Sequence, residues 1–312
     1  MVMIVKHINL HTELFNLSPI TACIGHFDGL HIGHQKLVSN TIKNAQELKI
    51  KSAMITFDPD PLQIITNQSS KYLTSLDQKI ILAQKFGLDM IYIIDFTNEM
   101  AELSAEDFVT KILVKLNIKV LTCGFDFHFG KNGVGNALSL REIKATSFQV
   151  DIIDPVLYNG RKISSTWISE SLEKGDVDLS NTLLGYPFSL TGRIIKGHQI
   201  GRKLNFPTAN IAYQTNQLLP KIGVYIGNFI INDKKYEAMI NIGNNPTFFD
   251  QNKITIEAHI LDFDQDIYNK EATIEFLTYL RNEVKYDTAD ELIKQLNLDV
   301  ESVRHYFVFT QD

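Results

Sequence analysis

The hydrophobic pattern of the chain changes near residue 184, and this change limits what the chain can fold into more than any other feature. Before it, short apolar runs such as Ile20–Ile24 alternate with segments of helical spacing such as Gly33–Leu48. After it, strand-like runs follow one another with no long helical pattern until the C-terminal region. The sequence therefore predicts two domains of different class, over residues 1–183 and 184–312.

The first pattern predicts a parallel sheet that helices cover on both faces. Continuous apolar strands separated by helices are typical of such a sheet, because both faces of each strand are buried. The expected strands are Ile20–Ile24, Ser52–Phe57, Met90–Ile94, Ile118–Thr122 and Phe148–Ile153. The expected helices are Gly33–Leu48, Ser75–Phe86 ending at Gly87, and a segment that Ser104 and Asp107 open and that runs to Leu116.

The second pattern predicts an antiparallel β-barrel with helices at its C-terminal end. A run of strands followed by helices is typical of this arrangement. Asn232 and Asp233 are expected to form a hairpin turn. The expected strands are Ser189–Ile195, Gly223–Ile231, Tyr236–Ile242, Ile254–Leu261 and Ala272–Leu280, and the expected helices are Ala289–Gln295 and Val300–Phe307.

The charge balance argues against two classes of partner. The chain carries 30 Lys and Arg against 36 Asp and Glu. A general nucleic-acid or membrane-surface protein needs a basic face, so neither partner is expected.

No apolar run approaches the roughly 18 residues that cross a bilayer, and a cytoplasmic location is expected. Cys23 and Cys123 have the spacing of neither a zinc site nor a disulfide framework, and each is expected in the core.

A glycine-rich turn from Gly25 to His34 follows the first strand and opens the first helix. Ligands of parallel sheets bind at this place, where a helix N-terminus presents unpaired N–H groups to an anion. The turn is therefore expected to bind the phosphates of ATP, with His31 and His34 stabilising charge on a leaving group. The phosphate-binding candidates within it are Gly25, Phe27, Asp28 and Gly33. A plain glycine-rich turn with surface histidines, and zinc binding by His26, His31 and His34, are the alternatives.

Three further stretches of the first half have an ordinary interpretation when each is taken alone. Phe57–Pro61 is a proline turn after a strand, Gly124–Lys131 is an aromatic-rich strand end, and Ile163–Thr166 is a helix cap. The hydroxyl groups of Ser165 and Thr166 are able either to cap backbone N–H groups or to contact phosphate.

The segment from Gly192 to Asn210 carries the main chemical signal of the second half. Gly197 and Gly201 predict a flexible loop that is expected to bind the phosphates of ATP, and Pro207 to Asn210 follow it. Alternate residues of an extended segment share a face, so Thr208 and Asn210 are expected to hold Mg²⁺ and phosphate oxygens together. A turn that leads into a strand is the alternative interpretation.

Taken in order, these motifs resemble those of one family. His31 to His34 is similar to the HxGH signature of the nucleotidylyltransferase superfamily, and Pro207 to Asn210 resembles the PTAN motif of riboflavin kinases. With Asn241–Phe248, Glu257–His259 and Leu280–Glu283, the chain looks like a prokaryotic bifunctional riboflavin kinase/FAD synthetase, also called an FMN adenylyltransferase. The resemblance implies a nucleotidylyltransferase-like domain followed by a riboflavin kinase barrel.

The resemblance implies two reactions that use ATP. In the C-terminal domain, riboflavin would be phosphorylated to FMN, with Glu257 as the base and Thr208 and Asn210 at the metal and phosphates. Arg281 and Glu283 are expected near the flavin or the phosphate. In the N-terminal domain, FMN would be adenylylated to FAD, with release of pyrophosphate. The residues that the resemblance places there are His31 and His34 at the ATP phosphates, Ser165 and Thr166 on the other side of the nucleotide, and Asp126 near the flavin or adenine pocket.

The chain departs from the family pattern at several positions. Trp167 and Ser169 stand where the family has arginines, which are the natural clamps for phosphate. Arg161 or Lys162 would have to compensate for them. His26 stands at a usual Asn position, and Asn205 at a usual Gly position. The latter change is mild because Asn tolerates a left-handed backbone.

Three functional hypotheses therefore remain open at this point. The chain is a bifunctional kinase and adenylyltransferase, a riboflavin kinase with a weakened or inactive adenylyltransferase domain, or a non-catalytic flavin- or nucleotide-sensing protein. The set of Thr208, Asn210 and Glu257 favours an enzyme, because a sensor needs no base. The expected ligands are riboflavin, FMN, ATP and Mg²⁺. The sequence does not define the oligomeric state.

Overall fold

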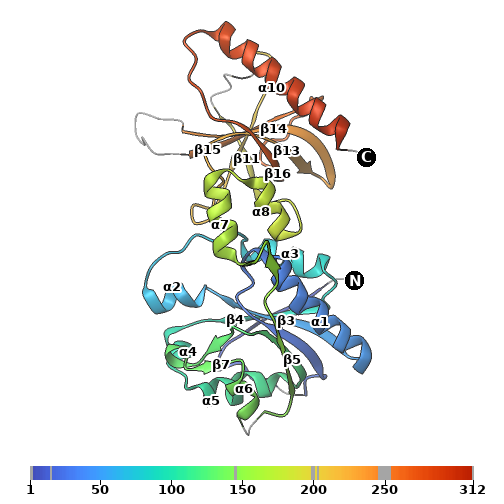
Figure 1. Ribbon diagram of the computed structural model, residues 1–312, viewed down its shortest axis with the longest axis vertical. Helices are drawn as coiled ribbons and strands as arrows, with labels where there is room; N and C mark the ends of the chain where they lie inside the picture. Colours follow the sequence, from blue (N-terminus) through green and yellow to red (C-terminus); the bar gives the residue numbers. More distant parts are fainter. Residues whose placement is uncertain are drawn as a thin grey trace. The chain divides into compact units, whose positions relative to one another are not determined.

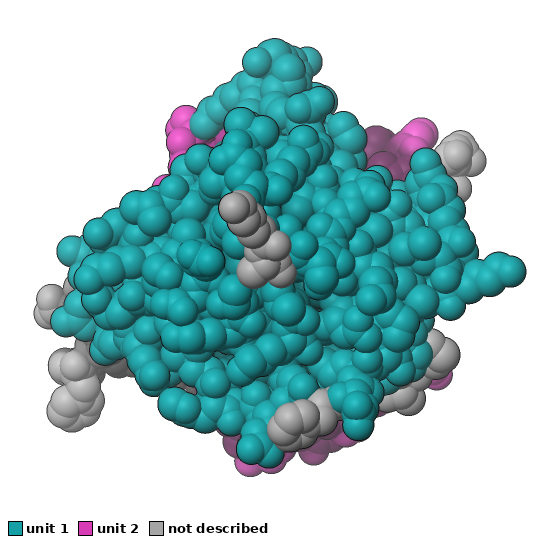
Figure 2. Space-filling view, turned by 90° about the horizontal axis from the view of Figure 1, so that it is seen from below, with its two compact units in different colours: residues 1–165 teal, residues 166–312 magenta. Residues whose placement is uncertain are grey.

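The computed structural model describes residues 3–14, 16–143, 146–197, 201, 204–244 and 254–310. The chain forms two compact units, Met1–Ser165 and Thr166–Asp312, which Figure 2 colours separately. Two helices, α7 (Ser165–Lys174) and α8 (Val177–Leu184), follow the first unit and, apart from Ser165, belong to the second. The functional boundary between residues 183 and 184 stays a prediction.

A six-stranded sheet, parallel throughout, forms the centre of the first unit, with the strand order β1-β4-β3-β2-β5-β8 (Figure 1). Five of these strands are the predicted ones. The sixth, β1, was missed because it lies at the edge of the sheet and is mostly exposed, so its sequence lacks a continuous apolar run. The strands are β1 (Ile4–Ile8), β2 (Ile20–Ile24), β3 (Lys51–Asp58), β4 (Met90–Asp95), β5 (Ile118–Gly124) and β8 (Gln149–Ile153).

Helices cover both faces of this sheet, as predicted. One core cluster joins the sheet to α1 (Ile32–Leu48) and α3 (Leu76–Lys85), and a second joins it to the segment 105–116. Cys23 and Cys123 are both buried in these clusters, as expected. The segment 105–116 is helical throughout but changes form along its length. It consists of α5 (Ala105–Phe108), a π-helical turn (Val109–Leu113) and a 3₁₀ turn (Val114–Leu116).

Short elements complete the first unit and shape its loops. Gly87, predicted to end α3, has a left-handed φ of 91° just beyond the helix. The short helices are η1 (Asp28–Leu30), α2 (Pro61–Thr66), α4 (Asn98–Ala101), η4 (Lys131–Gly133) and α6 (Ser139–Glu142). The short strands form two hairpins, β6 (His128–Phe129) with β7 (Gly135–Asn136), and β9 (Leu157–Tyr158) with β10 (Arg161–Lys162).

A closed barrel of six antiparallel strands forms the second unit, which confirms the predicted fold class. Asn232 and Asp233 have φ values of 50° and 60°, as a tight hairpin turn between β13 and β14 requires. In barrel order, the strands are β11 (Ser189–Ile195), β12 (Ala209–Ala212), β15 (Ile254–Ile260), β14 (Lys234–Asn244), β13 (Gly223–Ile231) and β16 (Glu271–Arg281).

One continuous helix, α10 (Ala289–Phe309), follows the barrel (Figure 1). The prediction of two separate helices here was wrong. The residues between them, 296–299, include neither Gly nor Pro, so nothing ends the helix. Asp299 within this stretch is buried and bonded to Arg281 of β16, while Val300 and Val303 pack against the barrel. Across the described residues, no helix is both long enough and apolar enough to cross a membrane.

Candidate active sites

The turn from Gly25 to His34 lies where the strand order of the sheet reverses. From β2 the chain proceeds through β3 to β4 on one side, and it then returns to the other side of β2 at β5. The loops that follow β2, β3 and β5 therefore meet at the carboxyl edge of the sheet, where ligands of such sheets bind. His26 Nε2 lies 3.8 Å from Asp60 Oδ2 of the loop after β3, so two of these loops are in contact.

His31 and His34 lie together at the N-terminus of α1. His31 is the N-cap, and its Nδ1 accepts a hydrogen bond from the backbone N–H of His34 at 3.3 Å. The two rings stack with centroids 3.7 Å apart. Burial, with a smaller contribution from Lys162, lowers the pKa of His31 to about 4. Burial and the neighbouring positive charges also hold the pKa of His34 well below its usual value, so both rings are neutral near pH 7.

The ring of His34 retains hydrogen-bonding capacity. Within the part of the chain that the structure describes, its Nδ1 is buried and has no hydrogen-bond partner. Negative charge bound near the turn would raise the pKa of both imidazoles. The zinc alternative finds no ligand set among the described residues, where no three His, Cys, Asp or Glu side chains gather at a common point.

Three further predicted residues shape this turn. A Cβ at Gly33 would lie 3.1 Å from the ring of His31, so any side chain at this position would crowd that ring. Phe27 is fully buried and has a left-handed φ of 55°. The carboxylate of Asp28 accepts hydrogen bonds from the backbone N–H groups of Leu73 and Thr74, at 3.0 and 3.1 Å. Phosphate binding by these residues and by Gly25 stays a prediction.

Residues from two other loops border the turn within the first unit. Ser165 Oγ donates a hydrogen bond to the carbonyl oxygen of Asp28 at 2.8 Å. Lys162 forms an ion pair with Asp126 and lies 4.7 Å from the ring centroid of Phe125. Lys162 is thus a cation near His31. It is one of the two residues expected to compensate for the arginines that Trp167 and Ser169 replace. Thr166 belongs to the second unit, so its predicted place at the nucleotide stays a prediction.

The predicted kinase residues lie on neighbouring strands of the barrel. Glu257 of β15 is directly opposite Asn210 of β12 on one side and Asn241 of β14 on the other. Thr208 precedes β12, and its Oγ1 donates a hydrogen bond to Glu257 Oε2 at 3.0 Å. Directly opposite residues of paired strands share a face, so these four side chains form one oxygen-rich row. The role of Asn241 was missed, since it depends on strand register.

The loop that precedes β12 packs closely against this row of side chains. The backbone at Gly197 touches the side-chain amide of Asn210 so closely that any Cβ would collide with it. The carbonyl of Gly201 accepts hydrogen bonds from the backbone N–H groups of Leu204 and Phe206, at 3.0 and 2.8 Å. Asn205 has a left-handed φ of 63°, which agrees with the expected tolerance of Asn at this position. The predicted motif residues 245–248 lie outside the described residues.

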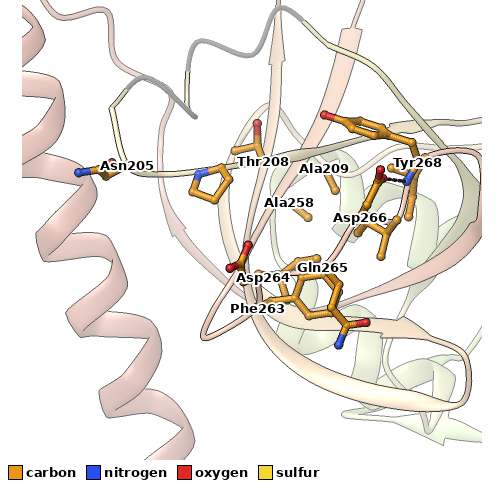
Figure 3. Close-up of a pocket in the computed structure, with 13 residues that line it drawn as sticks. Asn205, Thr208, Ala209, Ala258, Phe263, Asp264, Gln265, Asp266 and Tyr268 are labelled. Atoms are coloured by element: carbon orange, nitrogen blue, oxygen red, sulfur yellow. Dashed lines mark hydrogen bonds between the residues drawn. The ribbon is translucent and has the colours of Figure 1, made fainter.

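Two cavities meet at Thr208. One, of about 280 Å³, is lined by Glu257 and Asn241 together with apolar residues of β14 and α10, namely Met239, Leu292 and Leu296. The other, of about 390 Å³, lies on the far side of Thr208 and is bounded by the loop 263–268 (Figure 3). In Figure 3, Asp264 lies below Thr208, whereas Asp266 and Tyr268 lie to the right, near Ala209. Two cavities that share Thr208 offer space for two ligands side by side.

Arg281 and Glu283, the predicted flavin contacts, both line the first cavity. The guanidinium of Arg281 is held by Asp299, with Nη2 to Oδ2 at 2.6 Å and Nε to Oδ1 at 2.9 Å. Asp299 also accepts a hydrogen bond from Gln295 Nε2 at 2.9 Å. Glu283 accepts one from the backbone N–H of Asn244 at 3.3 Å. Arg281 therefore anchors α10 to the barrel, and its contact with flavin stays a prediction.

Comparison with known proteins covers both units. The family model of FAD synthetase matches residues 16–167, and that of riboflavin kinase matches residues 184–307. Proteins named bifunctional riboflavin kinase/FMN adenylyltransferase are similar along nearly the whole chain. One from Listeria monocytogenes is 38% identical, with 93% of each chain covered. One from Escherichia coli is 31% identical, with 96% of this chain and 97% of the relative covered.

A solved structure is similar over both units as well. It comes from Streptococcus pneumoniae and is described as a macrolide-efflux protein. It is 29% identical to this chain, with a TM-score of 0.88, and the match covers 97% of this chain and 99% of that one. The similarity extends the agreement from sequence to fold.

Proposed function

The chain belongs to the family of bifunctional riboflavin kinase/FMN adenylyltransferases, and we propose that its second unit phosphorylates riboflavin while its first unit adenylylates FMN. ATP is the donor in both reactions. Phosphorylation of riboflavin yields FMN and ADP, and adenylylation of FMN yields FAD and pyrophosphate. The observation that carries this proposal is the row of Thr208, Asn210 and Glu257, in which Thr208 lines both cavities and Glu257 lines one of them.

The two cavities of the barrel take different substrates. Glu257 lines only the cavity that α10 borders, so the hydroxyl that loses a proton binds there. The apolar side chains of Met239, Leu292 and Leu296 suit the flat ring system of riboflavin in the same cavity. ATP then occupies the cavity beside the loop 263–268, and Thr208 stands where the phosphoryl group passes from one to the other.

Glu257 acts as the general base of the kinase reaction. Its carboxylate accepts the proton of the riboflavin 5′-hydroxyl while the oxygen attacks the γ-phosphorus and ADP leaves. Thr208 Oγ1 donates to one oxygen of this carboxylate and so orients it toward the acceptor. Thr208 and Asn210 offer hydroxyl and amide oxygens, the hard ligands that Mg²⁺ prefers. When bound there with ATP, Mg²⁺ neutralises phosphate charge.

The first unit transfers the adenylyl group without a covalent intermediate. A phosphate oxygen of FMN attacks the α-phosphorus of ATP, and the bond to pyrophosphate breaks. The N-terminus of α1 and the rings of His31 and His34 hold the phosphates, and the charge on the leaving group draws protons to these rings. Ser165 and Asp126 border the same turn, and Lys162 adds a positive charge there.

The placement of Lys162 also bears on the weakened-adenylyltransferase hypothesis. Trp167 and Ser169 stand in place of two arginines, but Lys162 lies close enough to His31 to lower its pKa. One cation is thus present on the phosphate side of the turn, and it supports an active adenylyltransferase. The predicted lack of nucleic-acid and membrane-surface partners rests on the charge balance of the sequence, and the predicted cytoplasmic location rests on its lack of long apolar runs.

A direct assay distinguishes the three functional hypotheses. The purified full chain is incubated with MgATP and either riboflavin or FMN, and the flavins are separated by chromatography. FAD formed from riboflavin supports both activities, FMN formed from riboflavin without FAD supports the kinase alone, and flavin binding without turnover supports the sensor. Omission of Mg²⁺ and addition of EDTA should abolish FMN formation if Thr208 and Asn210 bind the metal.

A further inference from the structure

Lys79 is buried beneath the histidine turn of the first unit. It lies in the middle of α3, and only 4% of the residue is exposed. Burial of an ammonium group is costly unless the group is paired or serves a function. The nearest polar contacts of Nζ are uncharged oxygens, namely the carbonyl of His26 at 2.6 Å and Oγ1 of Thr56 at 3.3 Å. Buried Asp299 in the second unit, by contrast, has Arg281 as a direct counter-ion.

The contact with His26 fixes the path of the turn. The His26 carbonyl accepts two hydrogen bonds from the protein interior, from Lys79 and from Thr56 Oγ1 at 3.1 Å. The next residue, Phe27, has a left-handed φ of 55°, so the backbone changes direction here. A carbonyl oxygen turned toward a bound phosphate would repel it. Lys79 holds this carbonyl inside the fold, which leaves the N–H groups at the start of α1 to face the ligand.

The charge of Lys79 acts on the same place. Burial lowers the pKa of Lys79 to about 8, and Asp28, Asp58 and Asp60 oppose this effect. The lysine is therefore mostly protonated at pH 7. Its charge in turn contributes to the lowered pKa values of His26 and His34. A positive charge behind neutral imidazoles favours a polyphosphate in front of them.

We propose that Lys79 is a positioning residue for adenylyl transfer, which holds the His26 carbonyl inward and places a fixed positive charge beneath the turn from Gly25 to His34. The proposal rests on the adenylyltransferase function proposed for the first unit. A lysine kept only for packing has no advantage here, because an apolar side chain of similar length would fill the same space without the cost of burying a charge.

The variant Lys79→Met tests the proposal, with Lys85→Met on the exposed end of the same helix as the matched control. We expect Lys79→Met to lower kcat for FAD formation from FMN by about tenfold or more, with the KM for ATP within about threefold. Riboflavin phosphorylation by the second unit should stay unchanged in both variants. The melting temperature of the Met variant should equal or exceed that of the wild type, because the buried charge is gone.

Two results would overturn the proposal. One is FAD formation by Lys79→Met within about twofold of the wild type, a change too small for a positioning role. The other is a loss of FAD formation matched by a lower melting temperature, which indicates a purely structural role. If the wild type itself forms no FAD from FMN, the proposed adenylyltransferase function fails first. If wild type and variant form FAD equally, only the role of Lys79 fails.

A pH profile of the wild type supplies a second test that does not depend on a variant. Lys79 of the free protein loses its proton as the pH rises through about 8, so kcat/KM for FAD formation should fall between pH 7 and 9. The phosphate groups of the substrates complete their ionisation near pH 6 and do not interfere. The groups that face Lys79 are Asp28, Asp58, Asp60, His26 and His34, and burial lowers the pKa values of the two histidines. A rate that stays constant from pH 7 to 9 contradicts the proposal.

Discussion

The two candidate active sites are built in different ways. In the barrel, the reactive side chains lie on paired strands, where register alone places Asn210 and Asn241 on either side of Glu257. In the first unit, the histidines lie on a turn whose shape depends on residues far away in sequence. A short motif therefore defines most of the barrel site, whereas the motif of the first unit needs supporting residues that it does not contain.

Burial separates the two sites further. His31 is only 6% exposed, and burial lowers its pKa to about 4. Glu257 and Thr208 are only partly buried and border two open cavities. We therefore expect loss of one barrel side chain to remove one chemical step. Changes around the histidine turn should instead affect both its conformation and its chemistry, and controls are needed to separate the two.

The largest expected effect is that of Glu257→Gln on the kinase reaction. The glutamine keeps the shape of the side chain and can still accept the hydrogen bond from Thr208, but it cannot take a proton. Loss of a general base costs about 10²- to 10⁴-fold, so FMN formation should fall by about a thousandfold. FAD formation from supplied FMN should be unchanged.

The matched control is Glu271→Gln, which removes an exposed carboxylate at the start of β16. It should leave both activities at the wild-type rate. Kinase activity of Glu257→Gln within about tenfold of the wild type would show that another group accepts the proton.

The second largest effect is expected at His31, where the ring and the helix cap can be separated. Both His31→Ala and His31→Asn remove the imidazole, but Asn is itself a good N-cap and should keep the hydrogen bond to the N–H of His34. FAD formation from FMN should fall by about a hundredfold in both variants, because the ring stabilises charge on the leaving group. Only the Ala variant should be less stable, by about 1 kcal/mol.

Riboflavin phosphorylation serves as the internal control for both His31 variants and should not change. Retention of full FAD synthesis by His31→Asn would assign this residue a capping role alone. The imidazole of His31 would then have no chemical role in the first unit, and the residue would serve only to shape the turn.

The fold was largely predictable because most elements have a clear hydrophobic period. Strands β11 and β13 begin and end at the predicted residues, since both are bounded by turn residues or polar residues. The edge strand β1 has no apolar face that a period could reveal. The single helix α10 was divided in the prediction, because Asp299 in its middle owes its burial to a partner on β16. Tertiary contacts, which the local pattern does not contain, decided both cases.

The sites were predictable to a smaller extent. Motifs located the histidine turn and the Thr208 to Asn210 segment, but neither Asn241 nor Lys79 was assigned a role. Asn241 acquires its place through pairing of β14 with β15, which no single-strand pattern shows. Lys79 did leave a signal, since it lies three residues after Leu76 and four before Ala83, on the core-facing side of α3. A charged residue in such a stripe marks either a paired ion or a functional group.

The smallest expected effect concerns the link between the barrel and α10. Asp299 is buried and binds Arg281 through three hydrogen-bonded atom pairs, so Asp299→Asn leaves a neutral partner with weaker bonds. We expect the free energy of unfolding to fall by about 2 kcal/mol, less than the loss for a fully buried pair because Arg281 is partly exposed. Denaturant unfolding of the purified variant measures this change.

The same variant tests whether α10 shapes the flavin cavity. Leu292 and Leu296 of α10 line that cavity, so a looser helix should raise the KM for riboflavin by about threefold while kcat stays within about twofold. The KM for FMN in the first unit should not change. A large loss of kcat instead would mean that Arg281 acts on the reacting groups themselves. The barrel site would then depend, like the histidine turn, on a buried charge outside its motif.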